Sequence, residues 1–216
     1  MPDAKQAAAL LLRRYGRSFA DELGLDLSSE RSGVFCWFLA SLLFSTRISH
    51  LLALRAARSL FARGWKTPEA LARSTWQERV TALDEGGYVR YDERTSTMLG
   101  EAAEMLIAHY EGDLGKLREA AGRDPARERE LLKEFKGIGD VAVNIFFREM
   151  QLAWPELFPF ADERTLADAK ALGLPASAES LRRLVRRRRD FVRLVSALVR
   201  VRLEHKHEQW RGLAAA

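Results

Sequence analysis

The most constraining stretch of the sequence is a short interruption, Gly137-Ile138-Gly139, between two segments of helical periodicity. Glycine has no Cβ and readily takes positive φ, so the chain can turn tightly here and a ligand can approach the backbone. The first amides of the helix that begins near Asp140 have no partner within the helix, and the helix dipole adds positive charge there. The stretch therefore suits a nucleic-acid phosphate, although a glycine cap followed by an ordinary helix fits the same residues.

Length and composition set the outer limits. The chain has 216 residues, 47% of them hydrophobic, which is enough for the core of one large domain or two small ones. The most apolar stretch, 34–44, is too short to span a membrane, and no signal-peptide pattern is present, so we expect a cytoplasmic protein with no membrane partner. Cys36 is the single cysteine, which excludes a disulfide within the chain and a cysteine-based zinc or iron–sulfur site.

Apolar spacing and capping residues predict an all-α fold. No pair of strands and no repeat of solenoid period is found. Ser49, Thr67, Thr75, Asp113 and Asp124 are expected to begin helices, because their side chains can accept from free amides of the first turn. The predicted helices cover residues 4–23, 34–44, about 50–63, 68–72, 76–83, 91–110, 115–121, 125–135, 141–150 and 163–172, with one or two more between 177 and 210.

The net charge of +5 is unevenly distributed. From Ser177 onward the chain carries eleven Lys and Arg against four Asp and Glu. An excess of this kind indicates a polyanionic partner, although a solvated arginine-rich helix face explains a run such as 182–189 equally well.

Two segments together carry a resemblance to a known family. Residues 135–144, Phe-Lys-Gly-Ile-Gly-Asp-Val-Ala-Val-Asn, are followed by 154–162, Trp-Pro-Glu-Leu-Phe-Pro-Phe-Ala-Asp. The pair resembles the helix-hairpin-helix and following Gly/Pro-rich loop and Asp of the DNA glycosylase superfamily, which includes endonuclease III and 3-methyladenine DNA glycosylase II. The resemblance implies two helical lobes with a flipped base in the cleft between them: a six-helix lobe over 33–151, and a second lobe from 1–32 and 152–216.

The resemblance implies a catalytic role for Asp162. Breaking an N-glycosidic bond develops positive charge on the sugar, which a fixed carboxylate stabilises more than it stabilises the neutral ground state. The same carboxylate could orient or deprotonate the attacking water. An Asp that only caps the helix 163–172 is the structural alternative, and both roles can hold together.

The resemblance also implies a DNA interface. In the hairpin, Gly137, Ile138, Gly139 and Asp140 would hold a phosphate, and the carbonyls of Lys133, Phe135 and Ile138 would hold a monovalent cation, Na⁺ or K⁺. Elsewhere, Thr46 and Arg47 would fill the gap left by the flipped base, Tyr88, Arg90 and Tyr91 would line the opposite rim, and Arg164 would bind a phosphate. For each of these loop residues, an ordinary surface position is the alternative.

The sequence departs from the family pattern at the hairpin. Members that also cleave the DNA backbone carry a Lys two residues beyond the second glycine, where this chain has Val141. A valine cannot form a Schiff base with the sugar, so strand cleavage by that route is not expected. The iron–sulfur cysteines of endonuclease III are missing, and Val141 and Ile145 replace the aromatic residues expected from 3-methyladenine DNA glycosylase II. The residues that line the base pocket therefore cannot be assigned from the family.

From these features we expect a monofunctional DNA glycosylase of base excision repair. It would act as a monomer on double-stranded DNA, without an organic cofactor or iron–sulfur cluster, in the cytoplasm or at a bacterial nucleoid. Alkylated purines are the first substrate guess. The alternatives are a catalytically inactive glycosylase-fold protein that binds DNA structure or lesions, and a helical module whose arginine-rich face binds an acidic protein.

Overall fold

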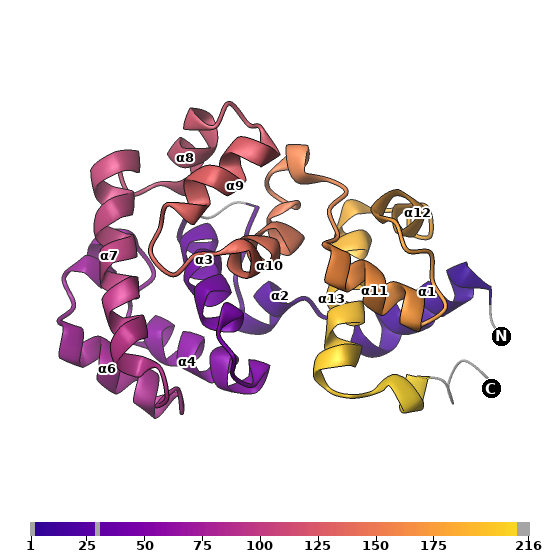
Figure 1. The fold of residues 1–216 in the computed structure, drawn as a ribbon, viewed down its shortest axis with the longest axis horizontal. Coiled ribbons are helices and arrows are strands. Elements are labelled where there is room, and N and C mark those ends of the chain that lie inside the picture. Colours follow the sequence, from indigo (N-terminus) through magenta and orange to yellow (C-terminus); the bar gives the residue numbers. More distant parts are fainter. Residues whose placement is uncertain (1–2, 29–30, 211–216) are drawn as a thin grey trace. The chain divides into compact units, whose positions relative to one another are not determined.

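The structure, a computed structural model, describes residues 3–28 and 31–210, and in these ranges every regular element is a helix. The all-α prediction is therefore confirmed (Figure 1). The chain divides into two compact units: unit 1 comprises Met1–Glu22 and Phe147–Ala216, and unit 2 comprises Leu23–Phe146. The functional lobes expected at 33–151 and at 1–32 with 152–216 stay a prediction, and residues 1–2, 29–30 and 211–216 of the latter lie outside the described residues.

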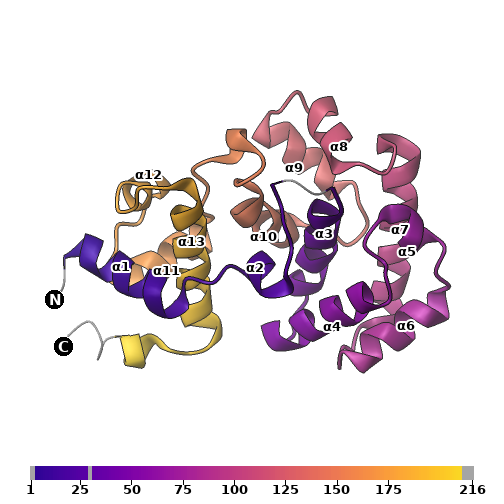
Figure 2. The ribbon, with the colours of Figure 1, turned by 180° about the vertical axis from the view of Figure 1, so that it is seen from behind.

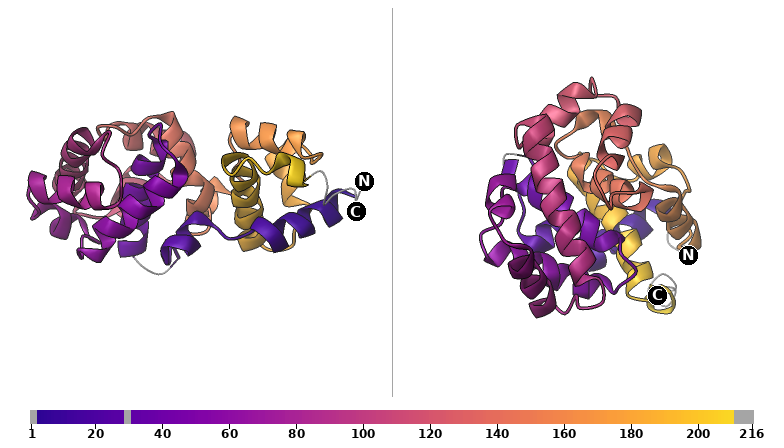
Figure 3. Two further views of the ribbon diagram at one scale, coloured as in Figure 1. Left: turned by 90° about the horizontal axis from the view of Figure 1, so that it is seen from below. Right: turned by 60° about the vertical axis from the view of Figure 1, so that its left-hand side comes forward.

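Unit 2 is built around the apolar helix α3, Arg31–Ser45. Its residues Phe35 to Ala40 are all buried, as the unbroken apolar run predicted, and Cys36 is fully inaccessible. The 19-residue helix α7, Asp92–Tyr110, packs against α5 (Pro68–Ala72) and α6 (Trp76–Glu85), and Figure 3 shows its full length. Unit 2 also contains α4 (His50–Ala62), α8 (Leu114–Ala120) and α9 (Pro125–Lys133).

The predicted helix starts of unit 2 are confirmed. The side chains of Ser49, Thr67, Thr75, Asp113 and Asp124 each accept a hydrogen bond from an amide of the following first turn. These bonds satisfy donors that the helix itself leaves free. Capping is a local interaction between near neighbours in the chain, which explains why the sequence reveals it.

Unit 1 has α13, Arg188–Leu203, at its centre. Both α1 (Ala4–Tyr15) and α11 (Glu163–Ala171) pack against it, as Figure 2 shows from behind. Leu11, Phe191 and Leu198 belong to its fully buried core. The unit also contains the 3₁₀ turn Pro155–Leu157 and α12 (Ala178–Arg182). The described part of the region after 177 thus contains α12, α13 and a further helical stretch over 207–210, where one or two helices are expected.

The helix predicted over 4–23 is wrong in its length. It ends at Tyr15, and a separate five-residue helix, α2 (Phe19–Leu23), follows. The Glu149 carboxylate accepts from the amides of Phe19 and Ala20 at 2.7 and 2.8 Å. These two amides open α2, so a buried acceptor distant in sequence starts a new helix where periodicity predicts a continuous one.

Helix α10, Asp140–Met150, begins in unit 2 and ends in unit 1, since the division falls between Phe146 and Phe147. Its first residues belong to the hairpin and its last turn carries Arg148 and Glu149. Among the described helices, none is long and apolar enough to cross a membrane.

Candidate functional site

The hairpin between α9 and α10 has the tight turn that its glycines predict. Gly137 has φ of +86°, and the amide of Ile138 donates to the carbonyl of Phe135 at 3.0 Å. The side chains of Phe135 and Ile138 are 1% and 5% exposed. Buried apolar side chains therefore hold the turn in place, while Gly137 and Gly139 are exposed and leave the backbone accessible to a ligand.

The two glycines of the hairpin have different surroundings. A Cβ at Gly137 would overlap the sulfur of Met98, and the positive φ is unfavourable for any other residue. A Cβ at Gly139 would meet no atom within 4 Å. Gly137 is thus required by the fold, whereas the space at Gly139 is open.

The first helical residue after the turn is an anion held by two cations. The Asp140 carboxylate accepts from Lys133 Nζ at 3.0 Å and from Arg129 Nη1 at 3.4 Å. The hydrogen bond from Lys133, aided by the nearby positive charges, holds the pKa of Asp140 below its usual value. The Arg129 side chain also donates to Asn144 Oδ1 at 2.8 Å. Because these cations offset the Asp140 charge, the start of α10 can still attract a phosphate.

The cation site implied at the hairpin would use main-chain oxygens. Lys133, Phe135 and Ile138 all lie in or next to the turn that joins α9 to α10, so their carbonyls are close enough in sequence to surround one small cation. The Phe135 oxygen already accepts from the Ile138 amide. The Na⁺ or K⁺ site stays a prediction; within 3–28 and 31–210, no group of His, Cys, Asp and Glu side chains could hold a metal ion.

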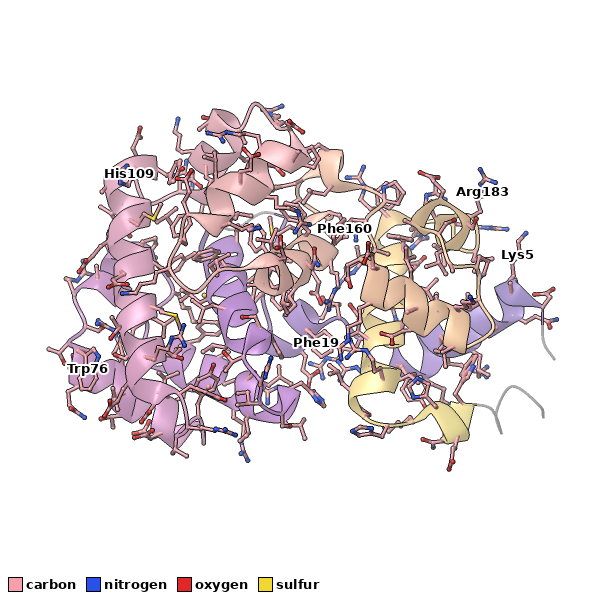
Figure 4. All side chains as sticks on the ribbon, in the orientation of Figure 1. Lys5, Phe19, Trp76, His109, Phe160 and Arg183 are labelled. Carbon is pink, nitrogen blue, oxygen red and sulfur yellow. The ribbon has the colours of Figure 1, made fainter. Side chains whose placement is uncertain are left out.

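The connector that leads to Asp162 is fixed to the end of α10. Gln151 donates through Nε2 to the carbonyl of Phe160 at 3.0 Å and accepts from the Phe160 amide at 2.9 Å. The ring of Phe160 packs edge-on against Phe147, with 5.6 Å between centroids; Figure 4 labels Phe160 among the surrounding side chains. The buried amide side chain thus replaces backbone pairing and fixes the last residues before Asp162.

Asp162 caps helix α11, as the sequence predicts. Its Oδ1 accepts from the amide of Thr165 at 3.2 Å, and its Oδ2 accepts from the Thr165 hydroxyl at 2.9 Å. Oδ2 also accepts from Arg148 Nε at 2.6 Å, and the side chains of Asp162 and Arg148 are only 7% and 13% exposed. The catalytic role implied for Asp162 stays a prediction.

Burial and charge act on Asp162 in opposite directions. Burial alone would raise the pKa of this carboxyl, but the positive charge of Arg148 and the hydrogen bonds from Thr165 and Arg148 outweigh it and lower the pKa. The group is therefore ionised at neutral pH, which is the state that stabilises positive charge on a sugar.

The loop at residues 45–49 is held by Tyr88. The Tyr88 hydroxyl donates to Thr46 Oγ1 at 2.7 Å, and the Tyr88 ring is 1% exposed. This differs from the expected place of Tyr88 on the rim of the DNA interface: Gly87, with φ of +80°, precedes a ring that lies in the core. Burial also raises the pKa of Tyr88. Tyr88 therefore supports Thr46, while Arg47 is exposed.

The remaining predicted residues lie on the surface of their own units. Arg90 is exposed, and its guanidinium lies 5.3 Å from the centroid of the Tyr91 ring. Arg164 is exposed in the first turn of α11. Val141, the second residue of α10, is 56% exposed, so the position where lyase members carry a lysine is open to solvent. The contacts of Arg90, Tyr91 and Arg164 with DNA stay predictions.

Sequence reasoning missed Arg148 and Glu149. Arg148 is the ion-pair partner of Asp162, and the Glu149 carboxylate accepts from the first amide of α2. One signal was available: the two adjacent charges lie in an otherwise largely apolar helix, Val141–Met150, where buried charges are expected only with partners. The identity of those partners was not readable from the sequence.

Comparison with known proteins bears on the fold. No protein-family model matches this sequence, and no curated protein matches it. Among solved structures, the chain is similar to endonuclease III in a trapped covalent intermediate with DNA, described as an estranged-adenine complex, with a TM-score of 0.52 and 14% identity. The match covers 93% of this chain and 86% of that one. The chain therefore shares the all-α fold of endonuclease III.

Proposed function

We propose that this protein is a DNA glycosylase that hydrolyses the N-glycosidic bond of a damaged base and leaves the strand intact. The observation that carries the proposal is an ionised, buried Asp162 at the start of α11, in a chain with the endonuclease III fold. That solved neighbour is an endonuclease III–DNA intermediate, which supports DNA as the partner. Double-stranded DNA, a monomeric state and a cytoplasmic location belong to the same proposal.

The chemistry assigns one step to Asp162. As the bond from C1′ to the base nitrogen breaks, its electron pair leaves with the base and positive charge develops on the sugar. The Asp162 carboxylate stabilises that charge in a site partly shielded from water. A water oxygen then bonds to C1′ and releases its proton, for which Asp162 is the proposed acceptor. The products are a free base and an abasic site.

Val141 supports hydrolysis without strand cleavage. Its side chain is exposed on the first turn of α10, where an amine would be needed to attack the sugar. An iron–sulfur cluster is not part of the proposal, because a single buried cysteine cannot supply its ligands. Alkylated purines are the first substrates to test.

A second function is favoured by Arg148. Its Nε lies 2.6 Å from Asp162 Oδ2, so the charge that would stabilise the sugar cation is already largely compensated. A protein of this kind could bind DNA structure or a lesion and release no base. The two candidates differ in one measurable outcome, namely base release.

The test incubates the protein with duplexes that carry alkylated, oxidised, deaminated or mismatched bases, followed by detection of free base and alkali-labile sites. Asp162→Asn keeps a good capping residue and should lower the release rate by about 10²–10³-fold. Asp168→Asn is the matched control, because Asp168 lies on the same helix and pairs with Arg202 Nε at 2.8 Å with its side chain 8% exposed.

The outcomes separate the candidates. Base release that depends on Asp162 but not on Asp168 supports the glycosylase. Binding to a duplex without release from any substrate, unchanged in Asp162→Asn, supports the binding protein instead. Strand nicks that appear without alkali would contradict the role argued from Val141.

A further inference from the structure

Unit 1 contains a groove with a large excess of positive charge. It lies between the C-terminal end of α1, the residues that follow up to Glu22, and α13, and its volume is about 730 Å³. Seven of its thirteen lining residues are Arg or Lys, and three are Asp or Glu. We call it the cationic groove and define it by Arg13, Arg14, Arg17, Arg189, Arg193 and Arg200. None of these residues belongs to the hairpin or contacts Asp162.

Each acid in the groove is paired with one of its cations. Asp21 Oδ1 lies 3.2 Å from Arg189 Nη2, and Glu22 Oε2 lies 2.8 Å from Arg200 Nη2. Glu204 Oε1 lies 3.3 Å from Arg200 Nη1. The carboxylates of the groove are therefore neutralised by its own arginines, and the other cations determine its net charge.

Of the other five cations, Lys206 pairs with Glu204 and Arg193 pairs with Asp190 at 3.5 Å, which leaves Arg13, Arg14 and Arg17. All three are exposed, and within the described part of the chain none forms an ion pair with a carboxylate. They come from the last turn of α1 and the residue just after its glycine cap. Three arginines without a carboxylate partner line one groove, so an added anion would meet uncompensated positive charge there.

The carboxyl end of α1 does not cancel this charge. The carbonyls at a helix C-terminus carry partial negative charge, but the carbonyl of the Gly16 cap and that of the next residue, Arg17, accept from donors on α13. Arg193 Nε donates to the carbonyl of Gly16, and Arg200 Nη2 donates to the carbonyl of Arg17 at 3.2 Å. Guanidinium groups of α13 therefore cover the carbonyls of the two residues that follow α1.

The composition of the groove favours phosphate as its ligand. Arginine binds phosphate oxygens with two parallel hydrogen bonds, which lysine cannot do. Arg189 also directly follows three exposed arginines, Arg186 to Arg188. Exposed cations thus continue along the chain beyond the groove, which suits a polymer with repeated phosphates better than a single phosphate.

We propose that the cationic groove binds the phosphodiester backbone of a nucleic acid, as a contact separate from the hairpin. The choice of nucleic acid among polyanions rests on the proposed function, whereas the charge of the groove does not. An acidic protein is the competing ligand and is an arm of the test.

The test measures binding of an undamaged 20-base-pair duplex, by fluorescence anisotropy, across a series of salt concentrations. The Arg13→Ala, Arg14→Ala, Arg17→Ala triple variant should bind at least 10-fold more weakly at low salt. The slope of log K against log salt should fall by about two to three, since each of the three lost phosphate contacts removes about 0.9. The Arg13→Lys, Arg14→Lys, Arg17→Lys variant keeps the charge and should retain most of the slope.

A control variant removes the same charge elsewhere. Lys66, Arg73 and Arg94 are exposed and belong to none of the proposed sites, so their triple replacement by Ala should change the slope by less than one. If both alanine triples lose the same amount of duplex affinity, net charge alone explains the loss, and the proposal that the cationic groove binds the duplex is overturned. No change in the Arg13, Arg14, Arg17 alanine triple would overturn it as well.

Two further readouts separate the groove from the proposed function. In one outcome, polyglutamate binding depends on Arg13, Arg14 and Arg17, whereas duplex binding is the same in the wild type and the alanine triple. That outcome would overturn the nucleic-acid ligand in favour of an acidic protein. Duplex binding that depends on the groove in a protein that releases no base would refute the glycosylase alone. Base release with normal binding by the alanine triple would refute the groove alone.

Discussion

Arg148 Nε lies 2.6 Å from Asp162 Oδ2, and both side chains are largely buried. The pair joins the last turn of α10 to the residue that caps α11. It keeps Asp162 ionised and oriented, and it also limits how much of the carboxylate charge is available to a substrate. The balance between these two effects decides whether the proposed chemistry occurs.

The loss of stability caused by replacing Arg148 should depend on pH. The lowered pKa of Asp162 means that its ionised form contributes to stability above the usual carboxyl pKa of 3.8, and that this contribution is lost as the pH falls through the lower folded value. Arg148→Ala leaves a buried carboxylate unpaired, so it should destabilise the protein by about 3 kcal/mol at pH 7. The difference from the wild type should shrink below pH 3.8, as urea unfolding between pH 2.5 and 7 would measure. Arg164→Ala, exposed on α11, is the control, and a pH-independent difference would refute the argument.

Glu149 should give the opposite pH dependence. Burial raises the pKa of Glu149, although the amides of Ala20 and Phe19 act against it. A raised pKa means that the contribution of Glu149 to stability is fully present below its unfolded pKa and is lost as the pH rises through the folded value. Glu149→Gln keeps one acceptor oxygen and should cost about 1–2 kcal/mol at pH 4. The cost should decrease toward pH 8, as thermal unfolding would show; a cost that grows with pH would contradict it. Glu208→Gln, at an exposed position, serves as control.

These two residues show where sequence reasoning ends. Capping by Asp162 and Ser49 was predictable, because each side chain meets amides two or three residues away. For the break after Tyr15, the sequence offered Gly16, which caps the end of α1, but it did not show the start of α2, because the acceptor for its amides is 130 residues along the chain. In the same way, the sequence singled out Asp162 but not Arg148, since helical periodicity says which residues share a face and not which side chains from other elements meet them.

The two glycines of the hairpin should respond differently to alanine. Gly139→Ala finds open space, so its stability should stay within about 0.5 kcal/mol of the wild type, while its methyl group obstructs a phosphate at the turn and weakens duplex binding. Gly137→Ala forces a positive φ and an overlap with Met98, and it should lose about 1–3 kcal/mol of stability. Thermal unfolding and duplex binding, measured side by side, check both. Normal binding by a folded Gly139→Ala protein would remove the hairpin from the DNA interface.

Val141→Lys should introduce the chemistry that the wild-type chain lacks. The side chain at this position is 56% exposed, so a lysine should fold without a large cost. If base release opens a sugar next to the start of α10, the new amine should form a Schiff base that borohydride traps as a protein–DNA adduct. Val141→Thr is the matched control without an amine. A catalytically active Val141→Lys protein that gives no adduct would place the sugar elsewhere.

The burial of Cys36 has a practical consequence. It is the single thiol of the chain and lies inaccessible within α3, so a thiol reagent can reach it only when that helix opens. Its labelling rate under native conditions is thus a built-in clock for local opening of unit 2. Because the folded background is silent, a cysteine placed on any exposed position can be modified selectively, which makes the protein well suited to attached spectroscopic probes.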